Sequence, residues 1–151
     1  MRNGKGKEYD KKTGQLIFDG EYLYGQKIKG KEYKNGKLEY EGEYIQNQKW
    51  NGKGYDEKGK TIYELKNGTG TVKDYFSYRK IFFEGKYLNG RKWKGKEYNK
   101  NGQLLFDGTF TNKGERLKGI IKSYDSAGNL EFEVKYDKNH TVFEHSSCLI
   151  H

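Results

Sequence analysis

Apolar and polar residues alternate in short segments that recur along the chain. In residues 18–22 (Phe-Asp-Gly-Glu-Tyr) the two aromatic residues and the glycine fall on one side of an extended strand, and the two acids fall on the other. Residues 40–44 (Tyr-Glu-Gly-Glu-Tyr) repeat the pattern. A period of two residues is typical of a β-strand with one apolar and one polar face.

Degenerate copies of this segment follow one another at nearly constant spacing. They begin at Phe18, Tyr40, Tyr63, Phe83, Phe106 and Phe132. The acid after each aromatic residue recurs in steps of 22, 23, 20, 23 and 26 residues. A period in the low twenties indicates a repeat architecture, in which each unit is stabilised by its neighbours because it cannot bury its own apolar face.

Each unit predicts two antiparallel strands and two turns. The first strand is followed by a turn such as Asn89-Gly90, a strong hairpin signal because both residues tolerate positive φ. A returning strand such as residues 94–98 then ends in a second Gly-rich turn. The expected fold is all-β, an elongated single-layer twisted antiparallel sheet of stacked β-hairpin repeats.

Four glycines occupy the middle of the aromatic face in the better-formed units. They are Gly20, Gly42, Gly85 and Gly108. A residue without a side chain at this place leaves room for a ring from the adjacent strand to lie over the backbone. We therefore expect these glycines to be structural.

The repeat array is predicted to cover residues 1–137, in about six units, with a C-terminal tail over residues 138–151. Residues 1–9 match the second half of a unit, so the first unit is incomplete. The third unit is short and has Leu65 where the glycine is expected, and the last unit has Val134 there. Any bend is expected at these irregular units.

The strand, the Asn-Gly turn and the following Gly-Lys-Gly or Gly-Lys-Glu-Tyr segment resemble the membrane occupation and recognition nexus (MORN) repeat family. The units around Gly42 and Gly85 fit best. The resemblance implies a non-enzymatic scaffold or adaptor whose partners are phospholipid headgroups and other proteins. It does not imply one activity, because such repeats also accompany lipid kinases, methyltransferases and antitoxin-type proteins.

Composition narrows the function further. The chain of 151 residues has a formal net charge of +9, no proline and no apolar run long enough to cross a bilayer. Its one cysteine allows no internal disulfide. We expect a cytoplasmic protein that can sit peripherally at a membrane, with an anionic phospholipid surface and an unidentified protein as partners.

A basic residue followed by an apolar residue starts several returning strands. The pairs are Lys27-Ile28, Lys49-Trp50, Lys92-Trp93 and Arg116-Leu117. We expect them to form a row along one edge that faces an anionic membrane or an acidic partner, with tryptophan suited to the headgroup layer. In the alternative interpretation the apolar members are core residues and the cations are solvated turn residues.

Positive charge is concentrated in the centre of the chain. Residues 61–100 hold ten Lys or Arg against four acids. The candidate lipid-binding or partner-binding residues are Lys27, Lys49, Trp50, Lys86, Arg91, Lys92, Trp93, Lys94, Lys96 and Arg116. The alternative is a lysine-rich edge that only blocks strand addition. Nucleic acid is not expected, since acids recur on the same strands as the lysines.

The tail ends in Cys148-Leu149-Ile150-His151, which has the Cys-aliphatic-aliphatic-X form of a prenylation signal. An ordinary thiol near the terminus is the alternative. The histidines around Cys148 match no zinc spacing, so no metal and no cofactor are expected. Carboxylates two residues apart on one strand indicate a solvated face and no acid/base pair, so no catalytic residue is expected.

These observations favour a non-enzymatic scaffold that binds anionic membranes, a protein partner, or both. Two alternatives stay open: a pure protein interaction module, including an antitoxin-like repeat protein, and the regulatory repeat fragment of a larger lipid kinase or methyltransferase. Open strand edges would also allow an end-to-end homodimer.

Overall fold

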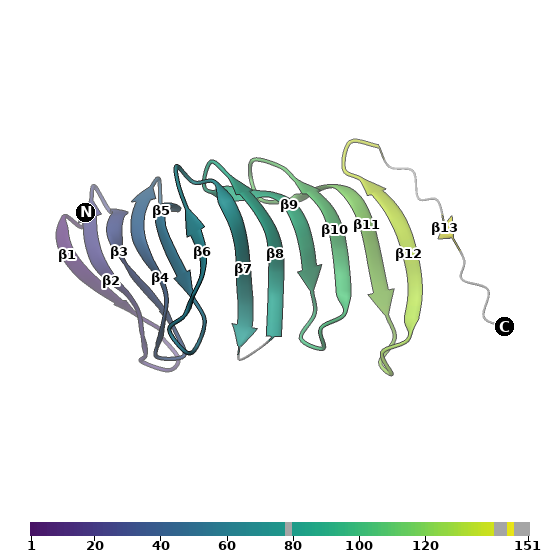
Figure 1. Ribbon diagram of the computed structural model, residues 1–151, viewed down its shortest axis with the longest axis horizontal. Helices are drawn as coiled ribbons and strands as arrows, with labels where there is room; N and C mark the ends of the chain where they lie inside the picture. The colour runs from purple at the N-terminus through teal and green to yellow at the C-terminus, as the bar shows by residue number, and fades with distance from the viewer. Residues whose placement is uncertain (78–79, 141–144, 147–151) are drawn as a thin grey trace. The chain divides into compact units, whose positions relative to one another are not determined.

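The computed structural model describes residues 1–77, 80–140 and 145–146, and these residues form β-strands and turns without a helix. Within each of two sheets, neighbouring strands follow one another in chain order as hairpins (Figure 1). The strands are β1 (Gly4–Tyr9), β2 (Leu16–Leu23), β3 (Gln26–Lys34), β4 (Lys37–Ile45), β5 (Gln48–Tyr55), β6 (Thr61–Leu65), β7 (Gly70–Ser77), β8 (Lys80–Leu88), β9 (Arg91–Tyr98), β10 (Leu104–Phe110), β11 (Arg116–Tyr124), β12 (Leu130–Asp137) and β13 (His145–Ser146).

The strands form two antiparallel sheets, each in sequence order. The first contains β1 to β6, and the second runs from β7 to β13. Neither sheet closes into a barrel. The predicted all-β fold of stacked hairpins is therefore confirmed. The chain divides into two compact units, Met1–Val72 with Tyr87–Arg91 and Lys73–Lys86 with Lys92–His151.

In the first unit, glycines face one another across neighbouring strands. The row is Gly6, Gly20, Gly30, Gly42 and Gly52, on β1 to β5. A Cβ atom on Gly20 would lie only 2.6 Å from Cζ of Phe18 and 2.7 Å from the Gly30 Cα atom. Phe18 is fully buried, as expected for a ring that lies over this row. The predicted steric role of Gly20 and Gly42 is confirmed.

The core of the first unit is a row of rings on the face that carries these glycines. Its buried members are Phe18, Tyr22, Tyr40, Tyr44, Tyr63, Leu65 and Val72. Rings of β2 and β4, the strands on either side of β3, meet edge to face, with 5.7 Å between the centroids of Phe18 and Tyr44. This geometry suits the opposite charges of ring edge and ring face.

The second unit repeats the arrangement. Gly95 pairs with Gly108, and Gly108 pairs with Gly119. A Cβ atom on Gly85 would lie 2.6 Å from Gly95 Cα, so Gly85 continues the row on β8. The buried residues of this unit are Phe83, Phe106, Phe110 and Val134. The predicted roles of Gly85 and Gly108 are confirmed in the same way.

The ladder of strands breaks between β6 and β7, at the short third unit. Leu65 takes the place of the glycine opposite Gly52 and is buried. Only an isolated bridge between Lys66 and Thr69 joins the chain on either side of the turn. The ladder of the first sheet therefore ends at β6, the strand that carries Leu65 in the glycine position.

Two kinds of turn connect the strands. In the hairpin turns, Asn89 and Gly90 have φ values of 51° and 78°, as the Asn-Gly signal predicts. The other turns begin with a side chain that accepts backbone hydrogen bonds: Asp10 Oδ1 accepts from the amides of Lys12 and Thr13 at 2.9 and 2.7 Å. These bonds lower the pKa of Asp10, the Thr13 amide contributing most.

The described part of the predicted tail contains one short strand, β13. β13 pairs with β12, with Glu133 opposite Ser146 and Val134 opposite His145. Val134, which replaces the repeat glycine, is buried. Cys148, the predicted prenylation site, lies outside the described residues.

Candidate functional site

The basic residues at the start of returning strands lie on the aromatic face. Lys27 Nζ lies 4.2 Å from the centroid of the Phe18 ring and 3.6 Å from Glu8 Oε2. Its side chain therefore crosses β2, from β3 to β1, with the ring beneath it. A cation over a ring is attracted to the negative π face, and the carboxylate stabilises it further.

The same contact recurs one repeat later. Lys49 Nζ on β5 lies 4.8 Å from the Tyr40 ring centroid and 3.2 Å from Glu32 Oε2 on β3. The side chains of Lys49 and Glu32 are only 20% and 24% exposed. Charged side chains therefore cover rings of the first unit, and their aliphatic stems shield these rings from water.

In the second unit, one carboxylate serves two cations. Glu97 accepts from Arg116 Nε at 2.8 Å and from Lys92 Nζ at 3.0 Å. Arg116 Cζ lies 5.0 Å from the Phe106 centroid, and Lys92 Nζ lies 4.6 Å from that of Phe83. Because the Glu97 side chain is 13% exposed, this cluster is held close to the core.

The structure therefore separates Lys27 and Lys92 from the apolar residues that follow them, whereas Trp50 and Leu117 are half-buried. Lys27, Lys49, Lys92 and Arg116 are engaged above core rings, whereas Ile28 and Trp93 are 38% and 42% exposed. The alternative interpretation placed the apolar residues in the core and the cations in solvent. For the pairs that contain Ile28 and Trp93, the structure shows the opposite: the apolar side chain is exposed and the cation lies over a core ring. Each of these four cations also has a carboxylate of the same chain within 4.0 Å.

A β-bulge explains the placement. Tyr22 pairs with Lys27 and Glu21 pairs with Lys29, so Ile28 is the extra residue between them. Strict alternation would put Lys27 and Lys29 on the same face, but the extra residue moves Lys27 to the aromatic face. The same shift at β11 places Arg116 opposite Phe110.

A second set of predicted cations lies on the opposite face of the second unit, which we call the outer face. Lys86, Lys94 and Lys96 are exposed, and none has a carboxylate within 4.0 Å in the part of the chain that the structure describes. Lys94 lies opposite Thr109 and Lys96 lies opposite Asp107 on β10. Lys94 Nζ lies 4.5 Å from the exposed Trp93 ring. This cluster of Lys86, Trp93, Lys94 and Lys96 is named the β8–β9 cationic patch.

The remaining two candidates belong to the first unit. Trp50 and Arg91 are both half-buried. The Trp50 carbonyl accepts a hydrogen bond from the Gly68 amide at 2.8 Å, and a Cβ atom on Gly68 would lie 2.9 Å from the indole. Trp50 therefore packs within its own unit.

Tyrosines beside the glutamates stay protonated at neutral pH. The Tyr22 hydroxyl donates to Glu8 Oε1 at 2.7 Å, and the Tyr98 hydroxyl donates to Glu84 Oε1 at 2.6 Å. Burial, followed by these hydrogen bonds, raises the pKa of each to about 12. Burial also raises the pKa of Tyr40 to about 12, and the nearby Lys49 charge opposes that rise. Such groups orient side chains and neither take up nor release a proton near pH 7.

Among residues 1–77, 80–140 and 145–146, the side chains form no cluster of three or more potential metal ligands. The same described residues contain no helix long and apolar enough to span a membrane. His140, one of the tail histidines, has its Nδ1 atom 3.4 Å from Asp137 Oδ2.

Sequence reasoning found the cations but missed their carboxylate partners. Glu8, Glu32 and Glu97 each stand two residues after a glycine of a returning strand. Lys27, Lys49 and Arg116 each stand three residues before such a glycine, 17 to 19 residues after the partner. This paired spacing was a usable signal, although only the bulge shows that both groups share a face.

We compared the chain with protein-family models and with curated proteins. No protein-family model matches the chain, and no curated protein matches it significantly.

Proposed function

We propose that the protein is a non-enzymatic scaffold that docks on anionic phospholipid surfaces through the β8–β9 cationic patch. The exposed lysines without carboxylate partners, Lys86, Lys94 and Lys96, carry this proposal. Their ammonium groups are free to meet an anionic headgroup, whereas Lys92 and Arg116 are bound to Glu97. The MORN-like repeat pattern supports the same ligand class.

Trp93 gives the patch an apolar component. Its side chain is 42% exposed and lies beside Lys94. An indole with one apolar and one polar side suits the headgroup layer of a bilayer, where tryptophan is enriched. Binding would then combine a charge term, weakened by salt, with a smaller apolar term that salt does not weaken.

The size of the charge term follows from the number of lysines. A basic residue close to an anionic leaflet contributes about 1 kcal/mol, so losing two of them weakens binding by roughly 30-fold. The test is co-sedimentation with phosphatidylcholine vesicles that contain or lack phosphatidylserine or a phosphoinositide. We expect binding that requires the anionic lipid and falls as ionic strength rises.

The decisive variant is the double substitution Lys94→Glu and Lys96→Glu. Its matched control, Lys100→Glu with Lys113→Glu, changes two exposed lysines of the same unit that lie in turns. Both variants lower the formal net charge from +9 to +5, since each substitution replaces a positive charge by a negative one and so lowers the net charge by two. We expect the first to abolish vesicle binding and the control to weaken it only slightly.

If both variants lost vesicle binding equally, net charge alone would drive binding. The assignment of the binding site to the β8–β9 cationic patch would then be wrong. Absence of binding to any anionic vesicle would remove the membrane proposal. The chain would then be better interpreted as a protein interaction module.

A further inference from the structure

The outer face of the first unit, which lies opposite its aromatic face, follows a charge rule. Each lysine of an interior returning strand lies between acids of both neighbouring strands. Lys29 pairs with Glu21 on β2 and with Glu43 on β4. Lys31 lies between Asp19 and Glu41 in the same way. Rows of acid, lysine and acid therefore run across the strands, and opposite charges on directly facing residues stabilise a sheet.

β1 satisfies this rule on one side only. Lys5 pairs with Glu21 and Lys7 pairs with Asp19, both on β2. No described strand lies along the other edge of β1. Lys7 reaches Asp19 at 3.7 Å with its side chain 54% exposed, and Lys5 is exposed with no carboxylate within 4.0 Å in the described chain. Two lysines at i and i+2 thus face an unpaired strand edge.

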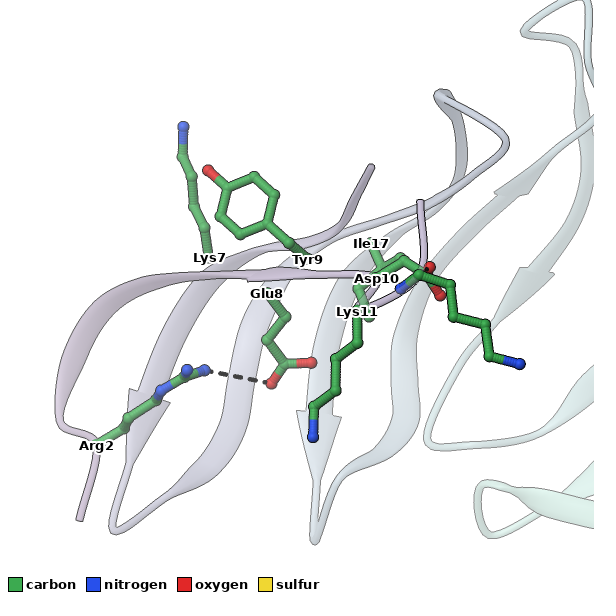
Figure 2. Close-up of a pocket in the computed structure, with 8 residues that line it drawn as sticks. Arg2, Lys7, Glu8, Tyr9, Asp10, Lys11 and Ile17 are labelled. Atoms are coloured by element: carbon green, nitrogen blue, oxygen red, sulfur yellow. Dashed lines mark hydrogen bonds and ion pairs between the residues drawn. The ribbon is translucent and has the colours of Figure 1, made fainter. Parts of the chain in front are cut away.

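An open pocket of about 780 Å³ is lined by residues of β1, of the turn to β2 and of β2. Figure 2 shows Lys7 and Tyr9 projecting from one face of β1, with Glu8 on the other face toward Arg2. Lys11, Lys12 and Ile17 also line it. The pocket thus combines four cations with the exposed Tyr9 and Ile17 side chains, against the two acids Glu8 and Asp10.

We propose that the edge of β1 binds an extended acidic segment of a partner protein as an added antiparallel strand. The segment would carry two carboxylates at i and i+2, which face Lys5 and Lys7 as Glu21 and Asp19 do on the other side. Strand addition is a common mode of peptide recognition: backbone hydrogen bonds supply affinity and alternate side chains supply specificity.

The aromatic face sets a second requirement. Inside the sheet, the glycine row places Gly30 between Gly20 and Gly42, and Glu32 between Phe18 and Tyr40. Gly6 and Glu8 hold the equivalent places on β1. The best segment is therefore aromatic-acid-Gly-acid-aromatic. The chain's own β12 fits less well, because residues 133 and 135 on its outer side are glutamate and lysine, and the lysine would face a lysine.

The probe is a fluorescein-labelled peptide with the sequence of residues 38–45, Leu-Glu-Tyr-Glu-Gly-Glu-Tyr-Ile. Binding to the full chain is measured by fluorescence anisotropy. Control peptides replace the three glutamates by glutamine, or carry N-methyl groups on alternate amides to remove backbone donors. Amide hydrogen exchange with and without the peptide locates the site.

The variant Lys5→Glu with Lys7→Glu should weaken peptide binding by about tenfold or more, since two facing charge pairs become repulsive. Lys58→Glu with Lys60→Glu, two exposed turn lysines of the same unit, is the matched control and should change affinity by less than about twofold. Exchange should slow in residues 4–9. Thermal unfolding of both variants shows whether the fold is kept.

Three results of the peptide experiments would overturn the proposal. These are equal binding of the glutamine or N-methyl peptide, protection outside β1, or an affinity unaffected by the β1 substitutions. Dimerisation in the absence of peptide that protects residues 4–9 would identify a second copy as the occupant and refute the acidic segment. Because Lys94 and Lys96 lie in the other unit, their substitution should leave peptide binding unchanged, which keeps this test separate from the vesicle test.

Discussion

The glycine row makes a sharp prediction about stability, tested by Gly20→Ala in β2. The new Cβ atom would lie 2.2 Å from the Lys29 carbonyl oxygen and 2.7 Å from Gly30 Cα, whereas ordinary contacts begin at 3.4 Å. The two strands would therefore have to separate by roughly 1 Å, at the expense of ladder hydrogen bonds, because backbone atoms cannot rotate away. The Cβ atom would also lie 2.6 Å from the Phe18 ring.

The magnitude follows from what must move. Phe18 is fully buried and contacts Tyr22 and Tyr44 edge to face, with centroids 5.4 and 5.7 Å away. Overpacking a core commonly costs about 1 to 3 kcal/mol, and a clash with backbone on one side and a buried ring on the other belongs at the upper end. We expect a loss of about 3 kcal/mol in the free energy of unfolding of the first unit.

Gly6→Ala is the matched control, at the same place in the motif on the edge strand β1. The nearest atom to its Cβ would be Cε2 of the Tyr22 ring at 3.1 Å, and no backbone atom outside its own chain neighbours is among the nearest contacts. A ring edge can shift by a few tenths of an ångström. We therefore expect Gly6→Ala to cost less than about 1 kcal/mol.

The assay uses the two tryptophans, because Trp50 belongs to the first unit and Trp93 to the second. In a Trp93→Phe background, urea unfolding followed by fluorescence reports the first unit alone. A Gly20→Ala variant within about 0.5 kcal/mol of its parent, or a Gly6→Ala variant equally destabilised, would refute the steric account of the row.

Two further predictions concern the charged groups on the sheet. Glu97→Ala, which leaves Lys92 and Arg116 above the rings without their shared carboxylate, should lower the unfolding free energy of the second unit by about 1 to 3 kcal/mol in urea titrations. Glu41→Ala removes only an exposed pair with Lys31 and should cost less than about 0.5 kcal/mol, and equal effects would contradict the covering role of the cations. Stability should also be constant up to the ordinary tyrosine pKa of 10.0 and fall as pH rises toward 12, because folding raises the pKa of Tyr22 and Tyr40 to about 12. Urea midpoints from pH 8 to 11.5, with tyrosinate absorbance as the monitor, check this, and an unchanged midpoint above pH 10 would contradict it.

Much of the fold could be predicted because the repeat pattern depends on residues that are close together in the sequence. The period of two around Phe18 fixes which residues face the core, and the Asn89-Gly90 pair specifies its turn with two positive φ values. Gly20 and Gly42 could be assigned a steric role in advance, since only a missing side chain lets a ring cross the backbone. Leu65 could be recognised as irregular, but not as the point where the ladder ends.

The candidate site was less predictable. Whether Lys27 faces solvent or the core depends on one extra residue, Ile28, and a bulge is chosen by the pairing of two strands and not by either strand alone. The sequence pattern therefore predicted the same role for Lys92 and Lys94. In the structure, Lys92 covers the Phe83 ring, whereas Lys94 lies exposed beside Trp93.

By itself, the sequence determined the hairpin repeat, the aromatic face with its glycines and the concentration of positive charge in residues 61–100. These are properties of short segments, and the hairpin and aromatic features recur in successive repeat units. Only the tertiary structure decided which cations are free. Lys27 and Lys49 reach across a whole strand to Glu8 and Glu32, so their partners lie 17 to 19 residues away and on the same face only after the bulge. Pairing between strands, a non-local property, separates the cations that lie beside a carboxylate from those that have none in the described part of the chain.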